Sequence, residues 1–175
     1  MKKVIRENLF ETNSSSVHAI VVNPKAELQI PETHVINFNV GEFGWELETY
    51  HSIEDRASYL WTAILEVYCK WNDNDESQKY YTEGAREWER YIIETINNEF
   101  KGNVDVYFEW PNKHTQFFYI DHSEELTPWL EILKNNPHNL LAYLLGADTE
   151  IRTGNDNDDA YPDKSCPEGY NIFIK

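Results

Sequence analysis

The sequence predicts an α+β fold, in which a largely antiparallel sheet is covered by two long helices and one or two shorter helices. Short segments of alternating apolar and polar residues lie near both ends of the chain and in its middle, which is typical of strands. Two long segments carry apolar residues at helical spacing. Because no internal repeat or linker separates these segments, we expect residues 1–175 to form one domain.

The first part of the chain is expected to supply three strands. Residues 2–6, 16–22 and 33–38 are rich in β-branched and apolar residues that alternate with polar ones. The segment 23–31 is bounded by prolines and indicates a loop between the second and third strands.

The two long helices follow. Ser52 stands at an N-cap position before two acidic residues, which favours a helix start there. A second helix is expected from about residue 78 to residue 100. Because aromatic and apolar stripes of this kind usually pack into a core, we expect both helices to cover one face of the sheet. The stripes are Ile53, Ala57, Leu60, Ile64, Val67 and Trp71 in the first helix, and Tyr81, Ala85, Trp88, Ile92, Ile96 and Phe100 in the second.

The rest of the chain alternates short helices and strands. Residues 103–110 and 116–120 are expected to form an antiparallel pair joined by residues 111–114. Ser123 is expected to cap a third helix that reaches Asn135. The remaining predicted elements are a helical piece at 138–145 ending at Gly146, a strand at 149–153, an irregular acidic segment at 154–169 and a closing strand at 170–174.

Charge limits the partners that the protein can have. The formal net charge is −16, and all of the excess lies after residue 40, because the bases and acids before it balance. Direct nucleic-acid binding requires a basic surface, so nucleic acid is not expected as a partner. An acidic surface instead favours a basic surface of another protein, although the charge also has the plainer interpretation of solubility.

Cellular location follows from the apolar runs and the cysteines. No run approaches the length of a membrane span, so no membrane partner is expected. Cys69 and Cys166 are far apart and no CxxC is present, which excludes a structural zinc site built on thiolates. The chain is therefore predicted to be cytoplasmic.

Three polar stretches could carry chemistry. They are expected at strand ends or in loops, where binding residues are often found. Carboxylate and imidazole side chains are also ligands for a divalent metal, with Asp121, His122 and Asp156 as the candidate ligands. The candidate residues are Glu11, Asn13, Ser14, Ser15, Ser16 and His18 in the first stretch, Asp121 and His122 in the second, and Asn155 and Asp156 in the third.

Each stretch also has a plainer interpretation. The first can be a connecting loop whose side chains bond to nearby backbone, the second can lead into the helix capped by Ser123, and the third can be a solvated loop. Ser16 and His18 share a strand face, but two-residue spacing and the lack of an elbow motif argue against a nucleophilic serine. No cofactor is indicated, and a divalent metal remains an alternative.

The same stretches carry a resemblance. The residues from Phe10 to His18, Tyr119-Ile120-Asp121-His122, and the residues from Thr153 to Asn157 resemble motifs of a family of small uncharacterised phage and prophage proteins. This resemblance implies a phage or mobile-element origin, and that the three stretches form one site. It implies no catalytic role for any residue.

Two functions remain open on the sequence. The first is binding, in which an acidic phage-type protein inhibits a host defence or nucleic-acid-handling protein. The loop aromatics Phe43 and Trp45 are then candidates for partner contact, because aromatic side chains often anchor interfaces. The alternative is a small enzyme or nucleotide-binding protein with a polar, metal-dependent site. Whether the protein is an enzyme stays open, as does its oligomeric state.

Overall fold

Strand β1 (Ser16–Val22) lies inside the largest sheet, as its apolar run leads one to expect. The computed structural model describes residues 16–44, 46–72, 75–81, 83–111, 118–120, 126–155, 165 and 167–174. β1 pairs antiparallel with β10 (Asn171–Ile174) on one side and with β9 (Glu150–Asn155) on the other. Beyond β9 lies β4 (Glu48–Tyr50), which completes a four-stranded antiparallel sheet. The predicted strand at residues 2–6 lies outside the described residues.

Two further pairs of strands are parallel. β2 (Val35–Phe38) pairs with β7 (Asp105–Phe108), and β3 (Glu42–Phe43) pairs with β8 (Tyr119–Ile120). The prediction that the segments around β7 and β8 pair with each other in an antiparallel hairpin is therefore wrong. Each of them instead takes a partner from the first third of the chain, which no turn signal near residues 111–114 could indicate.

The helix α1 (Ile53–Tyr68) is the centre of the molecule. Its first turn is capped as predicted, since the backbone N–H of Asp55 donates to Oγ of Ser52 at 3.0 Å. The helix is buried on nearly every side over its middle turns. The side chain of Arg56, in the first turn of this helix, is also buried. Its guanidinium donates to the carbonyl oxygens of Gly146 and Thr149, both at 2.8 Å.

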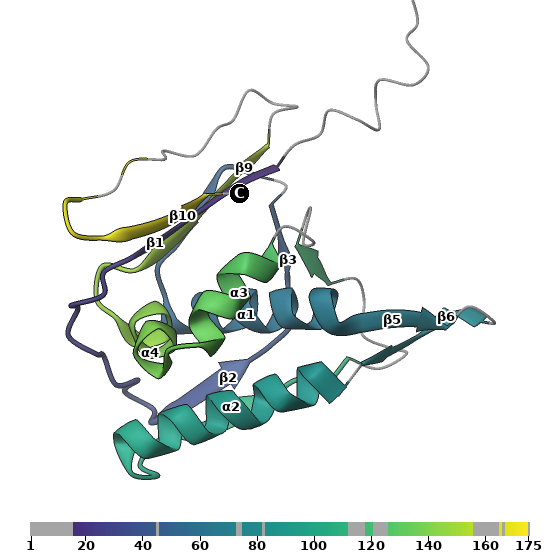
Figure 1. The fold of residues 1–175 in the computed structure, drawn as a ribbon, viewed down its shortest axis with the longest axis horizontal. Coiled ribbons are helices and arrows are strands. Elements are labelled where there is room, and N and C mark those ends of the chain that lie inside the picture. The colour runs from purple at the N-terminus through teal and green to yellow at the C-terminus, as the bar shows by residue number, and fades with distance from the viewer. Residues whose placement is uncertain are drawn as a thin grey trace, which may run out of the picture.

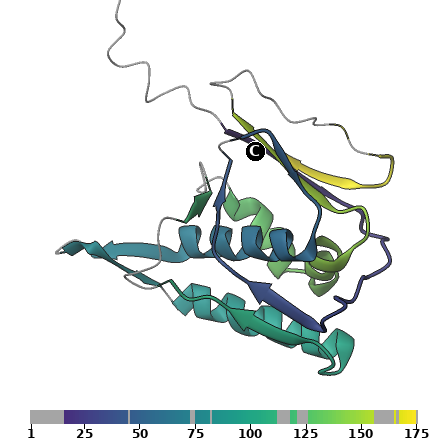
Figure 2. The same ribbon diagram turned by 180° about the vertical axis from the view of Figure 1, so that it is seen from behind.

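The helices form two layers below the four-stranded sheet (Figure 1; Figure 2, from behind). α1 lies in the middle layer with α3 (Thr127–Lys134) and α4 (Pro137–Leu145), while α2 (Glu83–Phe100) lies on the far side of α1. α2 packs against α1 and α4. The prediction that both long helices cover one face of one sheet is therefore wrong, because α1 is buried between the sheet and α2.

A hairpin replaces the predicted end of the first helix and start of the second. The chain leaves α1 at Tyr68 and enters β5 (Cys69–Asn72), which pairs antiparallel with β6 (Asp75–Tyr81). Trp71 and Tyr81, which were assigned to the two helical stripes, lie in these strands. The hairpin projects beyond the helices in both views (Figures 1 and 2).

The other apolar positions of the two stripes are confirmed as core. Ala57, Leu60 and Ile64 of α1 are fully buried, as are Ala85, Trp88, Ile92 and Ile96 of α2. They belong to one continuous cluster that also includes residues of β1, β2, α3 and α4. Over the part of the chain that the structure describes, the fold is thus an α+β fold with two long and two shorter helices, as the sequence predicts. None of the helices in the described part of the chain combines the length and apolar character needed to cross a membrane.

The start of α3 differs from the prediction. The helix begins at Thr127, and Leu126 occupies its N-cap position without a side-chain cap. The expectation that Ser123 caps this helix is therefore wrong, and Ser123 itself lies outside the described residues. Pro128 stands in the first turn, where its missing N–H costs no intrahelical bond. α4 ends as predicted, at Gly146.

Candidate functional site

Two of the three polar stretches meet across a pair of strands. In the antiparallel register of β1 and β9, Ser16 lies opposite Asn155 and His18 lies opposite Thr153. The first stretch therefore enters the sheet where the third leaves it. Residues 11–15 and 156–159 lie outside the described residues, so the other candidates in these stretches have no described position.

The second stretch follows β8, which is linked to the same region through side chains. Phe43 lies opposite Ile120 in the β3–β8 register, and Ile120 immediately precedes Asp121. The ring of Phe43 packs edge-on against that of Tyr59, with 5.1 Å between the ring centroids. Tyr59 in turn contacts His18. Asp121 and His122 lie outside the described residues.

His18 lies in the core rather than at a solvent-facing site. Its side chain is fully buried, and its Nδ1 is 2.8 Å from the hydroxyl of Tyr59, which is also fully buried. Burial raises the pKa of the Tyr59 hydroxyl well above its usual value, so this group stays protonated at neutral pH. The pair joins β1 to α1, and a substrate in solvent does not reach His18 in this structure.

Polar contacts extend from this pair towards the sheet edge. The buried hydroxyl of Thr153, opposite His18 in the register, donates to the backbone carbonyl of Glu46 at 2.9 Å. On the neighbouring edge strand, the hydroxyl of Tyr50 donates to the carboxylate of Glu48. Burial, and after it the hydrogen bond to Glu48, raises the pKa of the Tyr50 hydroxyl. The Thr153 bond ties the residue segment just before β4 to β9, while the Tyr50 bond lies within β4.

One predicted partner-contact residue is part of the core. Phe43 is only 6% exposed, and its ring also packs edge-on against Tyr50. The prediction that Phe43 is an exposed contact aromatic is therefore wrong. The glycines around it suggested an open loop, but β3 pairs with β8 and turns the ring inward. Trp45 lies outside the described residues.

The candidate metal ligands stay untested. Among the residues that the structure describes, no three His, Cys, Asp or Glu side chains lie close enough together to hold an ion. The predicted ligands Asp121, His122 and Asp156 are not among those residues.

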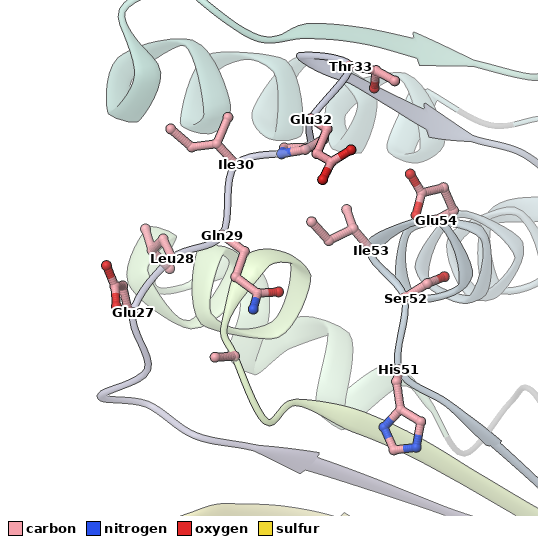
Figure 3. Close-up of a pocket in the computed structure, with 12 residues that line it drawn as sticks. Glu27, Leu28, Gln29, Ile30, Glu32, Thr33, His51, Ser52, Ile53 and Glu54 are labelled. Atoms are coloured by element: carbon pink, nitrogen blue, oxygen red, sulfur yellow. The ribbon is translucent and has the colours of Figure 1, made fainter.

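A groove that the sequence did not indicate lies between the segment 27–33 and the first turn of α1 (Figure 3). Its volume is about 740 Å³. The charged side chains along it include Glu27, Glu32 and Glu54, and none of the described lining residues is Lys or Arg. The apolar lining comes from Leu28, Ile30, Pro31, Ile53 and Ala147.

Residues 27–33 form the outer wall of this groove, and the first turn of α1 forms its inner wall. Long-range backbone bonds hold the outer wall in place. The N–H of Gln29 donates to the carbonyl of Leu145 at 2.7 Å, and the N–H of Ala147 donates to that of Glu27 at 3.1 Å. Leu28 and Gly146 form an isolated β-bridge between these bonds. Such contacts join residues more than a hundred positions apart, so no local pattern in the sequence could have placed this wall beside α1.

The distribution of ion pairs leaves the surface acidic. Arg56 is bound to carbonyl oxygens and four other described Arg and Lys side chains form ion pairs, while Lys25 and Lys101 are exposed. Exposed carboxylates that lie outside these pairs are found on several elements among the described residues. The pairs are Arg86–Glu89, Arg90–Glu83, Lys134–Glu87 and Arg152–Glu150, and the exposed carboxylates outside them include Glu32, Glu42, Glu54, Glu94, Glu99 and Glu131.

No model of a known protein family, no curated protein and no solved structure matches this chain.

Proposed function

We propose that this protein acts by binding a basic surface of another protein, as an acidic phage-type inhibitor of a host defence or nucleic-acid-handling factor would. The use of the basic side chains supports this proposal most directly. Arg56, Arg86, Arg90, Lys134 and Arg152 bond to other groups of the chain, so among the described residues the exposed carboxylates outside these bonds outnumber the basic side chains outside them. Such a surface attracts a positively charged partner and repels nucleic acid.

The site geometry favours binding over catalysis through His18. This histidine is a candidate ligand-binding residue of the first polar stretch, but it is buried and in contact with Tyr59. A general base has to reach the proton that it removes from a substrate. The described part of the candidate site therefore contributes stability at the junction of β1 and α1.

The experiment is to capture host proteins on the immobilised chain, purify each captured protein, and measure its affinity by calorimetry at rising salt. Screening shortens the range of charge interactions from about 10 Å at 0.1 M salt to about 3 Å at 1 M. We expect the partner to have a basic contact surface and its affinity to fall steeply over this range. An affinity that does not change with salt would contradict the electrostatic basis of the proposal.

The second candidate is a small enzyme or nucleotide-binding protein with a metal-dependent polar site. The observation in its favour is the register that places Ser16 opposite Asn155, because it brings two of the three polar stretches together. Its metal ligands would be Asp121, His122 and Asp156.

A further inference from the structure

The groove beside α1 combines negative charge with apolar surface. In Figure 3 the carboxylates of Glu32 and Glu54 and the side chain of Ile53 point into the space between the two walls. A Lys or Arg side chain has the complementary chemistry, since its methylene stem packs on apolar surface while its head carries the cation. Carboxylates pair with either head group, and with the guanidinium of Arg in a two-pronged geometry.

The dipole of α1 opposes a cation at this end of the helix, so the two effects must be weighed. The N-terminus of a helix carries the equivalent of about half a positive charge. The capping hydroxyl of Ser52 already accepts the N–H of Asp55, and Asp55 adds a carboxylate in the first turn. The carboxylates of Glu27, Glu32 and Glu54 outweigh the remaining half charge, so the groove stays negative.

Both walls are held by bonds that do not depend on a ligand. The outer wall is fixed at one end by the backbone bonds of Glu27 and Gln29, and near the other by the N–H of Asp105, which donates to the carbonyl of His34. The inner wall is fixed by Arg56, which ties the first turn of α1 to Gly146 and Thr149. A site that is already formed loses less conformational entropy when a partner binds.

The outer wall also presents an apolar side chain to solvent. Ile30 is 50% exposed, although it lies between the anchored ends of the wall. An exposed isoleucine beside carboxylates suits a partner segment in which a basic residue is followed by an apolar one.

We propose that this groove docks a basic segment of a protein partner, with the stem of one Arg or Lys on Ile53 and its cation between Glu32 and Glu54. This inference rests on the proposed binding function and identifies the surface that performs it. The apolar residue of the same partner segment packs against Ile30 on the outer wall.

The test uses the full chain and a short capped peptide that contains arginine and leucine. Its control peptide carries citrulline, a neutral isostere, in place of arginine. Affinity is measured by calorimetry for the wild type, for Glu32→Gln/Glu54→Gln, and for Glu42→Gln/Glu131→Gln. The second pair removes the same charge from exposed carboxylates that do not line the groove. Methyl NMR of Ile53 reports whether the peptide enters the groove, and thermal melting confirms that both variants fold.

We expect the groove variant to bind the arginine peptide about tenfold more weakly, which corresponds to about 1.4 kcal/mol. The affinity of the control variant for the arginine peptide should fall by less than about threefold, since distant charges act only through the screened overall field. The citrulline peptide should bind far more weakly than the arginine peptide, and only the latter should shift the Ile53 methyl signals.

Equal losses in the two variants would overturn the groove as the docking site and leave the proposed function standing, because binding would then depend on overall charge. Failure of the wild type to bind the peptide, or equal binding of the citrulline peptide, would also overturn it. Self-association of the wild type that the groove variant abolishes would identify a second copy as the occupant instead. The electrostatic basis of the proposed function fails on a different result, a captured partner whose affinity is independent of salt.

Discussion

The hydroxyl of Tyr59 lies 2.8 Å from Nδ1 of His18, and both side chains are fully buried. This contact joins His18, near the start of β1, to the middle of α1. Phe43 packs on the same tyrosine ring, so β3 is fixed at this point as well. Tyr59 thus links β1, which begins at the first polar stretch, to β3, which pairs with the strand that precedes the second.

Replacement of Tyr59 by phenylalanine tests this connection. Tyr59→Phe removes the hydroxyl and leaves Nδ1 of His18 without that partner in the core. We expect the free energy of unfolding to fall by about 1–3 kcal/mol, the cost of leaving a buried polar group without its hydrogen bond. Urea denaturation provides the measurement. Tyr107→Phe is the matched control, since Tyr107 is 58% exposed and should change stability by less than about 0.5 kcal/mol. An equally small effect at Tyr59 would show that the contact contributes little.

Trp88 tests whether α2 belongs to the core. Its side chain is fully buried and packs edge-on against the ring of Tyr91. Trp88→Ala should lower the free energy of unfolding by about 3–5 kcal/mol, because it opens a large cavity. The control is Leu47→Ala, at a side chain that is 59% exposed. A loss below about 1 kcal/mol at Trp88 would mean that α2 adds little to the stability of the fold.

The sequence predicted those elements whose signals are local. Ser52 caps α1 and Gly146 ends α4 because caps depend on a few neighbouring residues. The fully buried stripe that contains Trp88 followed from the helical period. The hairpin at residues 69–81 was missed because Trp71 and Tyr81 happen to continue that period, while strand pairing is what decides their conformation.

The candidate site was predictable only in part, for the same reason. The polar stretches were visible in the sequence, and two of them do meet where Ser16 faces Asn155. The burial of His18 and Phe43 depends on Tyr59, which lies on a helix far along the chain. The groove depends on the bridge between Leu28 and Gly146, and nothing near either residue indicates the other.

Alkaline pH should destabilise the protein through its buried tyrosines. Burial raises the pKa of the hydroxyls of Tyr59 and Tyr143, so both stay protonated in the folded state above pH 10. Tyrosines of the unfolded chain lose their protons near pH 10, so the unfolded state binds fewer protons there than the folded state. The stabilisation is therefore complete below about pH 10 and is lost as the pH rises further, by up to about 1.4 kcal/mol per pH unit for each tyrosine.

Urea denaturation between pH 8 and pH 11 measures this loss. In Tyr143→Phe the free energy of unfolding should decline less steeply than in the wild type above about pH 10. The substitution removes one hydroxyl that loses its proton in the unfolded state and keeps it in the folded state. Lysine titration affects both proteins equally, so the difference between their slopes isolates the tyrosine. Identical slopes would contradict the raised pKa of Tyr143.

Metal dependence separates the two candidate functions. An ion bound only by the folded state raises the melting temperature by mass action, and a chelator lowers it again. The metal-site function requires such a shift with manganese or zinc, since two carboxylates and an imidazole suit these ions better than calcium. The binding function proposed above predicts that the melting temperature stays the same with chelator and with either ion.

Asp121→Ala makes this measurement specific to the predicted ligands. If the wild type does show a metal-dependent shift, and the variant loses it while its melting temperature without metal is unchanged, Asp121 holds the ion and the metal-dependent function gains the advantage. A shift of equal size in the variant would place the ion at another acidic segment, because Asp121 would then contribute nothing to the site. We expect no shift in either protein, because the binding function proposed above requires no ion.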